Sequence, residues 1–231
     1  MTAAAPDPST PAPIRLERAR GRAEVAFKAE DGATVLDRLH QEGQAKIRLP
    51  KSYDGEPATA VLINTAGGIA GGDRLVYGAR FGTGTTALVT SQAAERVYRS
   101  SATDGSLAGV VETRLAVEAG AHAQWLPQET ILFDGAALDR RLEVEMAADA
   151  RLLLCESIVL GRAAMGERVE ACRLVDRFRI RRGGRLIFAD TLRIEGAAPE
   201  ILAGAATGGG ATATATIVWV DPGAEARLEG L

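Results

Sequence analysis

The chain has 231 residues, enough for one large domain or two small ones with a substantial buried core. Hydrophobic residues make up 46% and charged residues 25%, as in ordinary soluble globular proteins, and the formal net charge is −3. This charge argues against nucleic-acid binding, because DNA- and RNA-binding domains are usually strongly basic.

The sequence offers little material for a metal or redox site. It contains two cysteines, Cys155 and Cys172, and two histidines, His40 and His122. The cysteines lack the C-x-x-C spacing of zinc and redox sites, so we expect two buried, free thiols in a reducing cytoplasm. His122 lies in a strand-like stretch and is expected to be structural.

The two ends of the chain differ in character. Four prolines in the first 13 residues predict a disordered Ala/Pro-rich lead-in over residues 1–14, without the features of a signal peptide. Residues 15–231 are predicted to form a single domain. Residues 201–220 are uncharged but rich in glycine, and they predict a glycine turn entering a strand instead of a membrane span.

Alternation of apolar and polar residues dominates the sequence and predicts strands. Leu142, Val144 and Met146 alternate with charged residues, and residues 172–188 alternate on both sides of Gly183-Gly184, which predicts a hairpin with a primed turn. The predicted fold class is mainly β, with layered sheets of sandwich or solenoid-like form and one or two short α-helices. Residues 91–100 are the predicted helix.

The strongest local motif is the glycine-rich segment 64–75, NTAGGIAGGDRL. Its glycines allow positive φ and close backbone approach. Three interpretations are open: a phosphate-binding loop, a plain structural loop, or a loop that presents Asp73 to a cation or partner. The first is disfavoured because Asp73 stands where a phosphate loop needs Lys.

Two enzyme classes remain as alternatives. Residues 82–87 have the pattern G-x-G-x-x-A, and Asp104 lies at the distance of the acid in dinucleotide-binding proteins, but strand-like residues follow where a helix is needed. A carbohydrate-active β protein would pair acids such as Glu129, Asp134, Glu156 and Glu167. Aromatic residues, which sugars stack on, make up only 4% of the chain.

Two further segments are unusual. Residues 125–134, WLPQETILFD, place a polar cluster between apolar flanks, and residues 156–167, ESIVLGRAAMGE, carry Arg162 and Glu167 beside glycines. Polar groups in such a setting are hydrogen-bonded when buried, or they line a water-filled space.

Five segments in this order resemble the urease accessory protein family UreD, also called UreH. They are Gly21-Arg22-Ala23, NTAGGIAGGDRL (64–75), TSQAAERVYRS (90–100), WLPQETILFDGA (125–136) and CESIVLGRAAMGE (155–167), and the resemblance covers roughly residues 15–220. It implies a mostly β fold of layered sheets with two helices. It also implies further strands and a terminal helix that this sequence lacks.

The resemblance implies a non-catalytic role in urease maturation. Such a protein would form a complex with UreF and, through it, with the GTPase UreG on apo-urease, with no nucleic-acid or membrane partner. It would bind no cofactor tightly and would pass Ni²⁺ on transiently. Tyr98, Arg99, Trp125 and Trp219 are candidate interface residues, because interfaces favour aromatic residues and Arg.

Carboxylates and amides within the family-like segments are the candidates for a nickel path. Ni²⁺ is held tightly by clustered imidazoles or thiolates, which this chain does not offer, so a passing ion would meet oxygen ligands. The predicted path residues are Asp73, Gln92, Glu95, Glu129, Asp134, Glu156 and Glu167.

Overall fold

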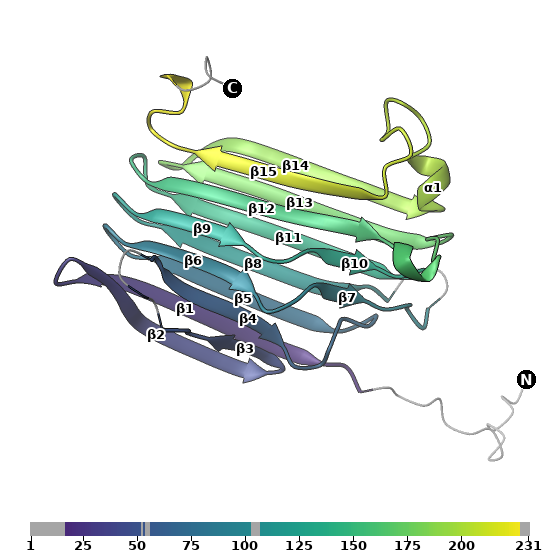
Figure 1. The fold of residues 1–231 in the computed structure, drawn as a ribbon, viewed down its shortest axis with the longest axis horizontal. Helices are drawn as coiled ribbons and strands as arrows, with labels where there is room; N and C mark the ends of the chain where they lie inside the picture. The colour runs from purple at the N-terminus through teal and green to yellow at the C-terminus, as the bar shows by residue number, and fades with distance from the viewer. Residues whose placement is uncertain (1–16, 52, 54–55, 103–106, 227–231) are drawn as a thin grey trace, which may run out of the picture.

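The computed structural model describes residues 17–51, 53, 56–102 and 107–226, so the predicted lead-in lies outside the described residues. The described residues form two β-sheets packed face to face (Figure 1). The prediction of a mainly β protein with layered sheets is confirmed.

The first layer, sheet A, is a seven-stranded sheet with the order β14-β13-β11-β8-β5-β1-β2. Its strands are β1 (Arg20–Glu30), β2 (Ala33–Gly43), β5 (Arg74–Phe81), β8 (Gly109–Val117), β11 (Ala137–Met146), β13 (Cys172–Arg182) and β14 (Arg185–Gly196).

The second layer, sheet B, has eight strands in the order β3-β4-β6-β9-β12-β10-β7, with β15 paired to β12. Its strands are β3 (Ala45–Arg48), β4 (Ala58–Asn64), β6 (Thr86–Ser91), β7 (Glu95–Val97), β9 (His122–Leu126), β10 (Thr130–Leu132), β12 (Arg151–Leu160) and β15 (Ala213–Val220).

The chain crosses from one sheet to the other as it advances, from β4 to β5, back to β6, and onward to β13. Neighbouring strands within each layer are therefore mostly parallel: β5, β8, β11 and β13 in sheet A, and β4, β6, β9 and β12 in sheet B. Antiparallel partners close the ends, as β2 does on β1 and β14 on β13. This winding matches the solenoid-like form that was predicted.

The predicted hairpin around Gly183-Gly184 is confirmed. β13 and β14 pair antiparallel, and the two turn glycines have φ angles of 56° and 76°. Both central residues of a type I′ turn need positive φ, which glycine adopts without steric cost.

Alternating side chains of both layers meet in one core. Phe27, Phe81 and Phe178 are fully buried, and the rings of Phe27 and Phe81 lie 5.8 Å apart. Burying a side chain of this size contributes roughly 1.5–3 kcal/mol to folding. Cys172 is buried and Cys155 half-buried, both as free thiols, and His122 contacts Arg151 at 2.8 Å.

Regular helix is confined to α1 (Ala198–Ile201) and the 3₁₀ helix η1 (Ala163–Met165) within the described residues. The predicted helix over residues 91–100 is wrong: this segment contains β7. The Glu95 amide donates to the Glu129 carbonyl at 2.9 Å, and fully buried Val97 packs into the core. Pairing with β10 thus overrides the local helical preference.

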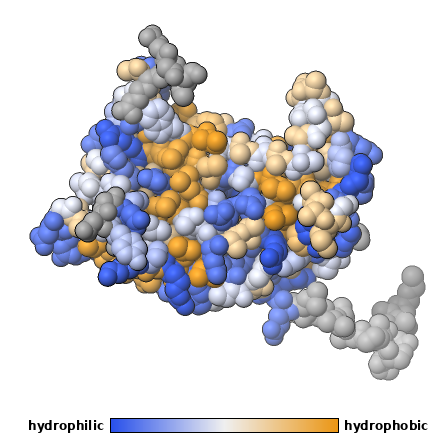
Figure 2. All heavy atoms as spheres, in the orientation of Figure 1, coloured by the Kyte–Doolittle hydropathy of each residue, from blue (hydrophilic) through white to orange (hydrophobic). Residues whose placement is uncertain are grey.

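Residues 201–220 form turns that lead into β15, as predicted. Figure 2 shows hydrophobic residues gathered over β12 and β15, where Leu153, Ile217 and Trp219 are exposed. No helix among the described residues is long and apolar enough to cross a membrane.

Candidate functional site

A cavity lined by both polar and apolar side chains lies between the two sheets, beside the carboxyl ends of β4, β6 and β9. Parallel strands end at the same edge of a sheet, so the loops that follow them collect there. The cavity has a volume of about 170 Å³, room for about six water molecules at roughly 30 Å³ each. Its polar lining residues are Asn64, Tyr77, Ser91, Gln92, Glu95, Arg96, Thr113, Gln128, Thr130, Arg140 and Glu156.

A buried ionic cluster forms one wall of the cavity. Arg140 on β11 donates from Nε to Asp176 Oδ1 at 2.9 Å and from Nη2 to Asp176 Oδ2 at 2.5 Å, within sheet A. Its Nη1 lies 2.7 Å from Glu156 Oε2 of β12, in the opposite sheet. All three side chains are at most 8% exposed. The two acids more than offset the cost of burial and hold the pKa of Arg140 above its ordinary value.

The two carboxylate oxygens of Glu156 have different contacts. Oε1 accepts a hydrogen bond from Trp125 Nε1 at 2.7 Å. Oε2 is close to Arg140 but has no aligned hydrogen-bond donor among the described residues, so that contact is an ion pair without hydrogen-bond geometry. Burial raises the pKa of Glu156, and Arg140 and Trp125 oppose this rise only in part. A buried acceptor left in this state is a place for a water molecule or a cation.

Glu95 is the second carboxylate of the cavity. Asn64 Nδ2 donates to both of its oxygens, at 3.1 and 3.3 Å, and also to the Gly68 carbonyl at 3.0 Å. Burial raises the pKa of Glu95 to about 7, although the hydrogen bond from Asn64 lowers it. Burial and the charge of Glu95 likewise raise the pKa of Tyr77. Glu95 therefore exchanges a proton near neutral pH.

The structure brings three of the seven predicted path residues together at the cavity: Gln92, Glu95 and Glu156. Glu129 is half-buried and holds β7 through its backbone carbonyl; it does not line the cavity.

Asp134 and Glu167 lie in loops outside the cavity and are held by arginines. Asp134 pairs with Arg99 and accepts from the Ala171 amide at 2.9 Å. Glu167 pairs with Arg162 at 2.8 Å, and Arg162 stacks over Phe133 at 4.1 Å from the ring centroid. With these acids in ion pairs and Glu156 bound to Arg140, none of the three is a free acid of the kind a glycosidase needs.

Asp73 fastens the glycine-rich segment 64–75 to the N-terminal part of the sheet. Its Oδ1 accepts from the Ala19 amide and its Oδ2 from the Ala70 amide, both at 2.8 Å. Gly67, Gly68 and Gly72 have positive φ. Because both oxygens of buried Asp73 bind backbone, the geometry favours the structural interpretation of this loop.

The dinucleotide-binding alternative is wrong in its structural premise. Residues 82–87 lead into strand β6, and no helix follows them; the Thr85 hydroxyl closes the turn on the Gly82 carbonyl at 2.7 Å. Asp104 lies outside the described residues.

Sequence reasoning missed Arg140 and Asp176, although the pattern contains a signal. Arg140 shares the phase of Leu138 and Leu142, and Asp176 shares the phase of Leu174 and Phe178. A charge in the apolar phase of a strand points into the core. Trp125, one of the interface candidates, is 2% exposed and belongs to this interior cluster, so it is a core residue.

The cavity is poor in strong nickel ligands. Among the described residues no group of three or more His, Cys, Asp or Glu is placed to hold a metal ion. Two carboxylates, amides and hydroxyls can bind a hydrated divalent cation weakly and release it.

Comparison with known proteins determines the family of this chain. The model of the UreD urease accessory protein family matches residues 19–231. This chain belongs to the UreD family. The UreD of Agrobacterium fabrum is 45% identical over 216 residues, covering 94% of this chain and 74% of the relative. The UreD of Rhizobium leguminosarum bv. viciae is 48% identical over 219 residues, covering 94% and 78%. The UreD of Chelativorans sp. is 44% identical over 231 residues, covering 100% and 80%.

Proposed function

We propose that this chain is a non-catalytic scaffold of urease maturation. In this proposal it binds UreF and, through UreF, the GTPase UreG, and holds them on apo-urease in the cytoplasm. Ni²⁺ passes through the cavity between the sheets on its way to the urease active site and is the cargo of the complex, with no cofactor tightly bound. Membership of the UreD family supports the accessory role.

One observation carries the nickel path: Glu156 Oε2, which pairs with Arg140 but accepts no hydrogen bond among the described residues, lies in a cavity that is also lined by Glu95. Burial raises the pKa of Glu95 to about 7, so Glu95 can exchange a proton for a cation near neutral pH. The Arg140, Glu156 and Asp176 cluster carries one negative charge when all three are ionised, so it does not repel a cation.

Because the ligands that the cavity offers are weak, they support passage of Ni²⁺ and not its storage. Oxygen ligands rank below imidazole and thiolate for Ni²⁺, and ligand groups spaced around a wet cavity leave the ion its water shell. We therefore expect the isolated chain to bind Ni²⁺ weakly and reversibly, with loss of the ion to a mild chelator in equilibrium dialysis. Retention against the chelator would contradict passage.

The scaffold role is tested by co-expression with UreF and size-exclusion chromatography. We expect one stable complex, which then recruits UreG and apo-urease. The same experiment with Glu95→Gln distinguishes the scaffold role from the nickel path. We expect this variant to form the complex as before, because the cavity lies inside the sandwich. Failure of the folded, unaltered chain to bind UreF would contradict the scaffold role.

A further inference from the structure

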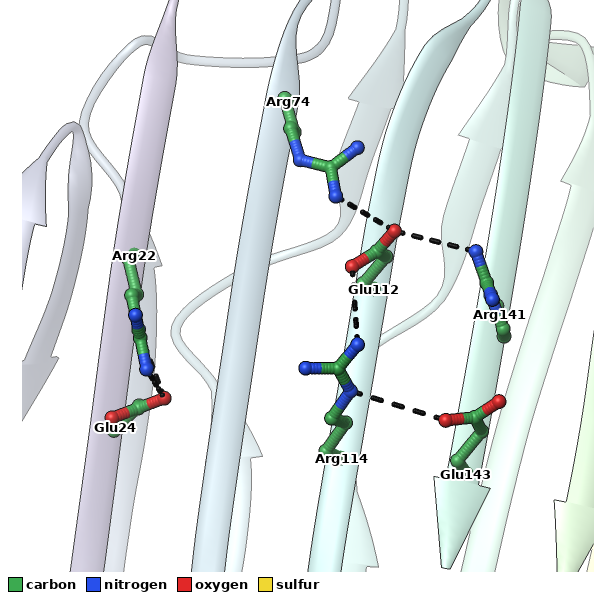
Figure 3. Close-up of polar contacts among 7 residues, drawn as sticks. All are labelled: Arg22, Glu24, Arg74, Glu112, Arg114, Arg141 and Glu143. Atoms are coloured by element: carbon green, nitrogen blue, oxygen red, sulfur yellow. Dashed lines mark hydrogen bonds and ion pairs between the residues drawn. The ribbon is translucent and has the colours of Figure 1, made fainter.

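The outer faces of the two sheets differ in charge. On sheet A, outward residues of neighbouring strands form ion pairs: Glu112 lies 2.8 Å from Arg74 and 3.3 Å from Arg141. Arg114 lies 3.9 Å from Glu143 on the same face (Figure 3). Such a face stays solvated, because covering it would cost the hydration of every charge on it.

The outer face of sheet B has an uncharged region that crosses five strands. One row of residues in register runs through Thr59 on β4, Leu88 on β6, Gln124 on β9, Leu153 on β12 and Trp219 on β15. The next outward residues along the same strands are also uncharged: Val61, Thr90, Leu126, Cys155 and Ile217. We refer to these ten residues, together with Ser157 and Ala215, as the uncharged patch.

The uncharged patch is most exposed where β12 and β15 lie side by side. Ile217 is 69% exposed, Trp219 42% and Leu153 36%. Figure 2 shows the hydrophobic residues gathered there. Contiguous exposed apolar regions of more than a few hundred Å² mark interaction sites.

The uncharged patch has large side chains at one end and small ones at the other. Along β15 the outward residues change from Ala215 to Ile217 and then Trp219. On β12, Ser157 lies opposite Ala215, and Leu153 lies opposite Trp219. The two strands therefore change from small to large in the same direction.

We propose that the uncharged patch binds the same patch of a second copy of this chain, related to the first by a twofold axis. A twofold axis through the middle of the patch lays the large end of one copy on the small end of the other, at both ends of the contact. This contact buries none of the ion pairs that a contact through the outer face of sheet A would bury. An uncharged surface is thus covered by an uncharged surface of matching shape.

The size of the patch agrees with a weak dimer. Its five strands have between five and ten residues each. With strands about 4.8 Å apart and a rise of about 3.3 Å per residue, they offer a footprint of about 600 Å². Stable interfaces bury about 600–1,000 Å² on each partner, so the patch reaches the lower end of this range. We expect a dimer Kd that is roughly micromolar.

Sedimentation equilibrium of the full chain, at concentrations from below to well above micromolar, measures this association. We expect a reversible equilibrium between monomer and dimer. Ile217→Lys is expected to raise the dimer Kd about tenfold or more, because the twofold contact would bury the new charge twice. Ala215→Trp fills the small end of the patch and is expected to raise the dimer Kd as well, because overpacking forces the surfaces apart.

The matched control is Leu186→Lys on β14, an apolar residue that is 41% exposed and lies outside the patch. This variant is expected to leave the dimer Kd unchanged. A chain that stays monomeric at every concentration would overturn the proposal, and so would equal effects of Ile217→Lys and Leu186→Lys. An unchanged Kd with Ala215→Trp would overturn the packing of large on small ends. A monomeric chain that binds UreF, and loses this binding with Ile217→Lys, would assign the patch to UreF instead.

Discussion

Arg140 and Glu156 tie the two sheets together from inside. Arg140 Nη1 on β11 lies 2.7 Å from Glu156 Oε2 on β12, with both side chains at most 8% exposed. A buried charge is stable only when it is paired, so each of these residues depends on the other. The same pair lines the cavity, which makes one contact part of both the fold and the candidate site.

Replacing Arg140 by Met leaves Glu156 and Asp176 buried without their cation. We expect the free energy of unfolding to fall by about 3–5 kcal/mol, as when one partner of a buried ion pair is lost. Denaturant unfolding measures this. Arg141→Met, on the exposed face of the same strand, is the matched control and is expected to cost less than about 1 kcal/mol. Equal losses of unfolding free energy for the two variants would show that Arg140 does not stabilise the cluster more than an exposed arginine does.

Trp125→Phe retains an aromatic ring but removes the N–H that binds Glu156 Oε1 at 2.7 Å. We expect a loss of about 1–3 kcal/mol, the range for a hydrogen bond to a charged or buried group. A double-mutant cycle with Glu156→Gln isolates the pair from other effects of the ring. A coupling energy near zero would mean that Trp125 contributes only by packing.

Stability is expected to depend on pH through Glu95. Because burial raises the pKa of Glu95 from 4.5 to about 7, the folded protein binds more protons than the unfolded chain between these pH values. The free energy of unfolding therefore falls as pH rises through this interval, by at most about 3 kcal/mol. Urea unfolding at several pH values, compared between the unaltered chain and Glu95→Gln, measures this. The same pH slope in both would contradict the assignment.

Asp73→Ala removes the acceptor of two backbone amides, those of Ala19 and Ala70. Each donor left without a partner costs about 1–3 kcal/mol, so we expect a loss of about 2–6 kcal/mol for the two. The control is Glu30→Ala, which breaks only an exposed pair with Lys28 at 3.0 Å and is expected to cost less than about 1 kcal/mol. Equal stability of the Asp73 and Glu30 variants would contradict the structural role of Asp73.

Local pattern was enough to predict the strands but not their partners. Alternation and Gly183-Gly184 located the hairpin of β13 and β14, because the turn and the period are local properties. The helix prediction for residues 91–100 was wrong because this segment contains β7, and the pairing of β7 with β10 depends on a segment more than 30 residues away. A short strand with no alternation of its own is decided by such contacts.

The site was predicted only in part for a similar reason. Glu95 and Glu156 were identified as candidates, but nothing local distinguished them from Asp134 or Glu167, which bind arginines in loops. Which carboxylate faces the cavity depends on how the two sheets are stacked. Arg140 was the residue whose strand phase already indicated the interior.

Nickel delivery through the cavity is tested most directly by the metal content of urease. Apo-urease is matured with the UreF and UreG complex containing either Glu95→Gln with Glu156→Gln, or the control pair Glu24→Gln with Glu30→Gln, two acids of β1 that do not line the cavity. Size-exclusion chromatography first establishes that both complexes assemble. We predict that nickel per urease falls severalfold with the cavity pair and is unchanged with the control pair. Full nickel loading by an assembled complex with the cavity pair would contradict passage of Ni²⁺ between the sheets.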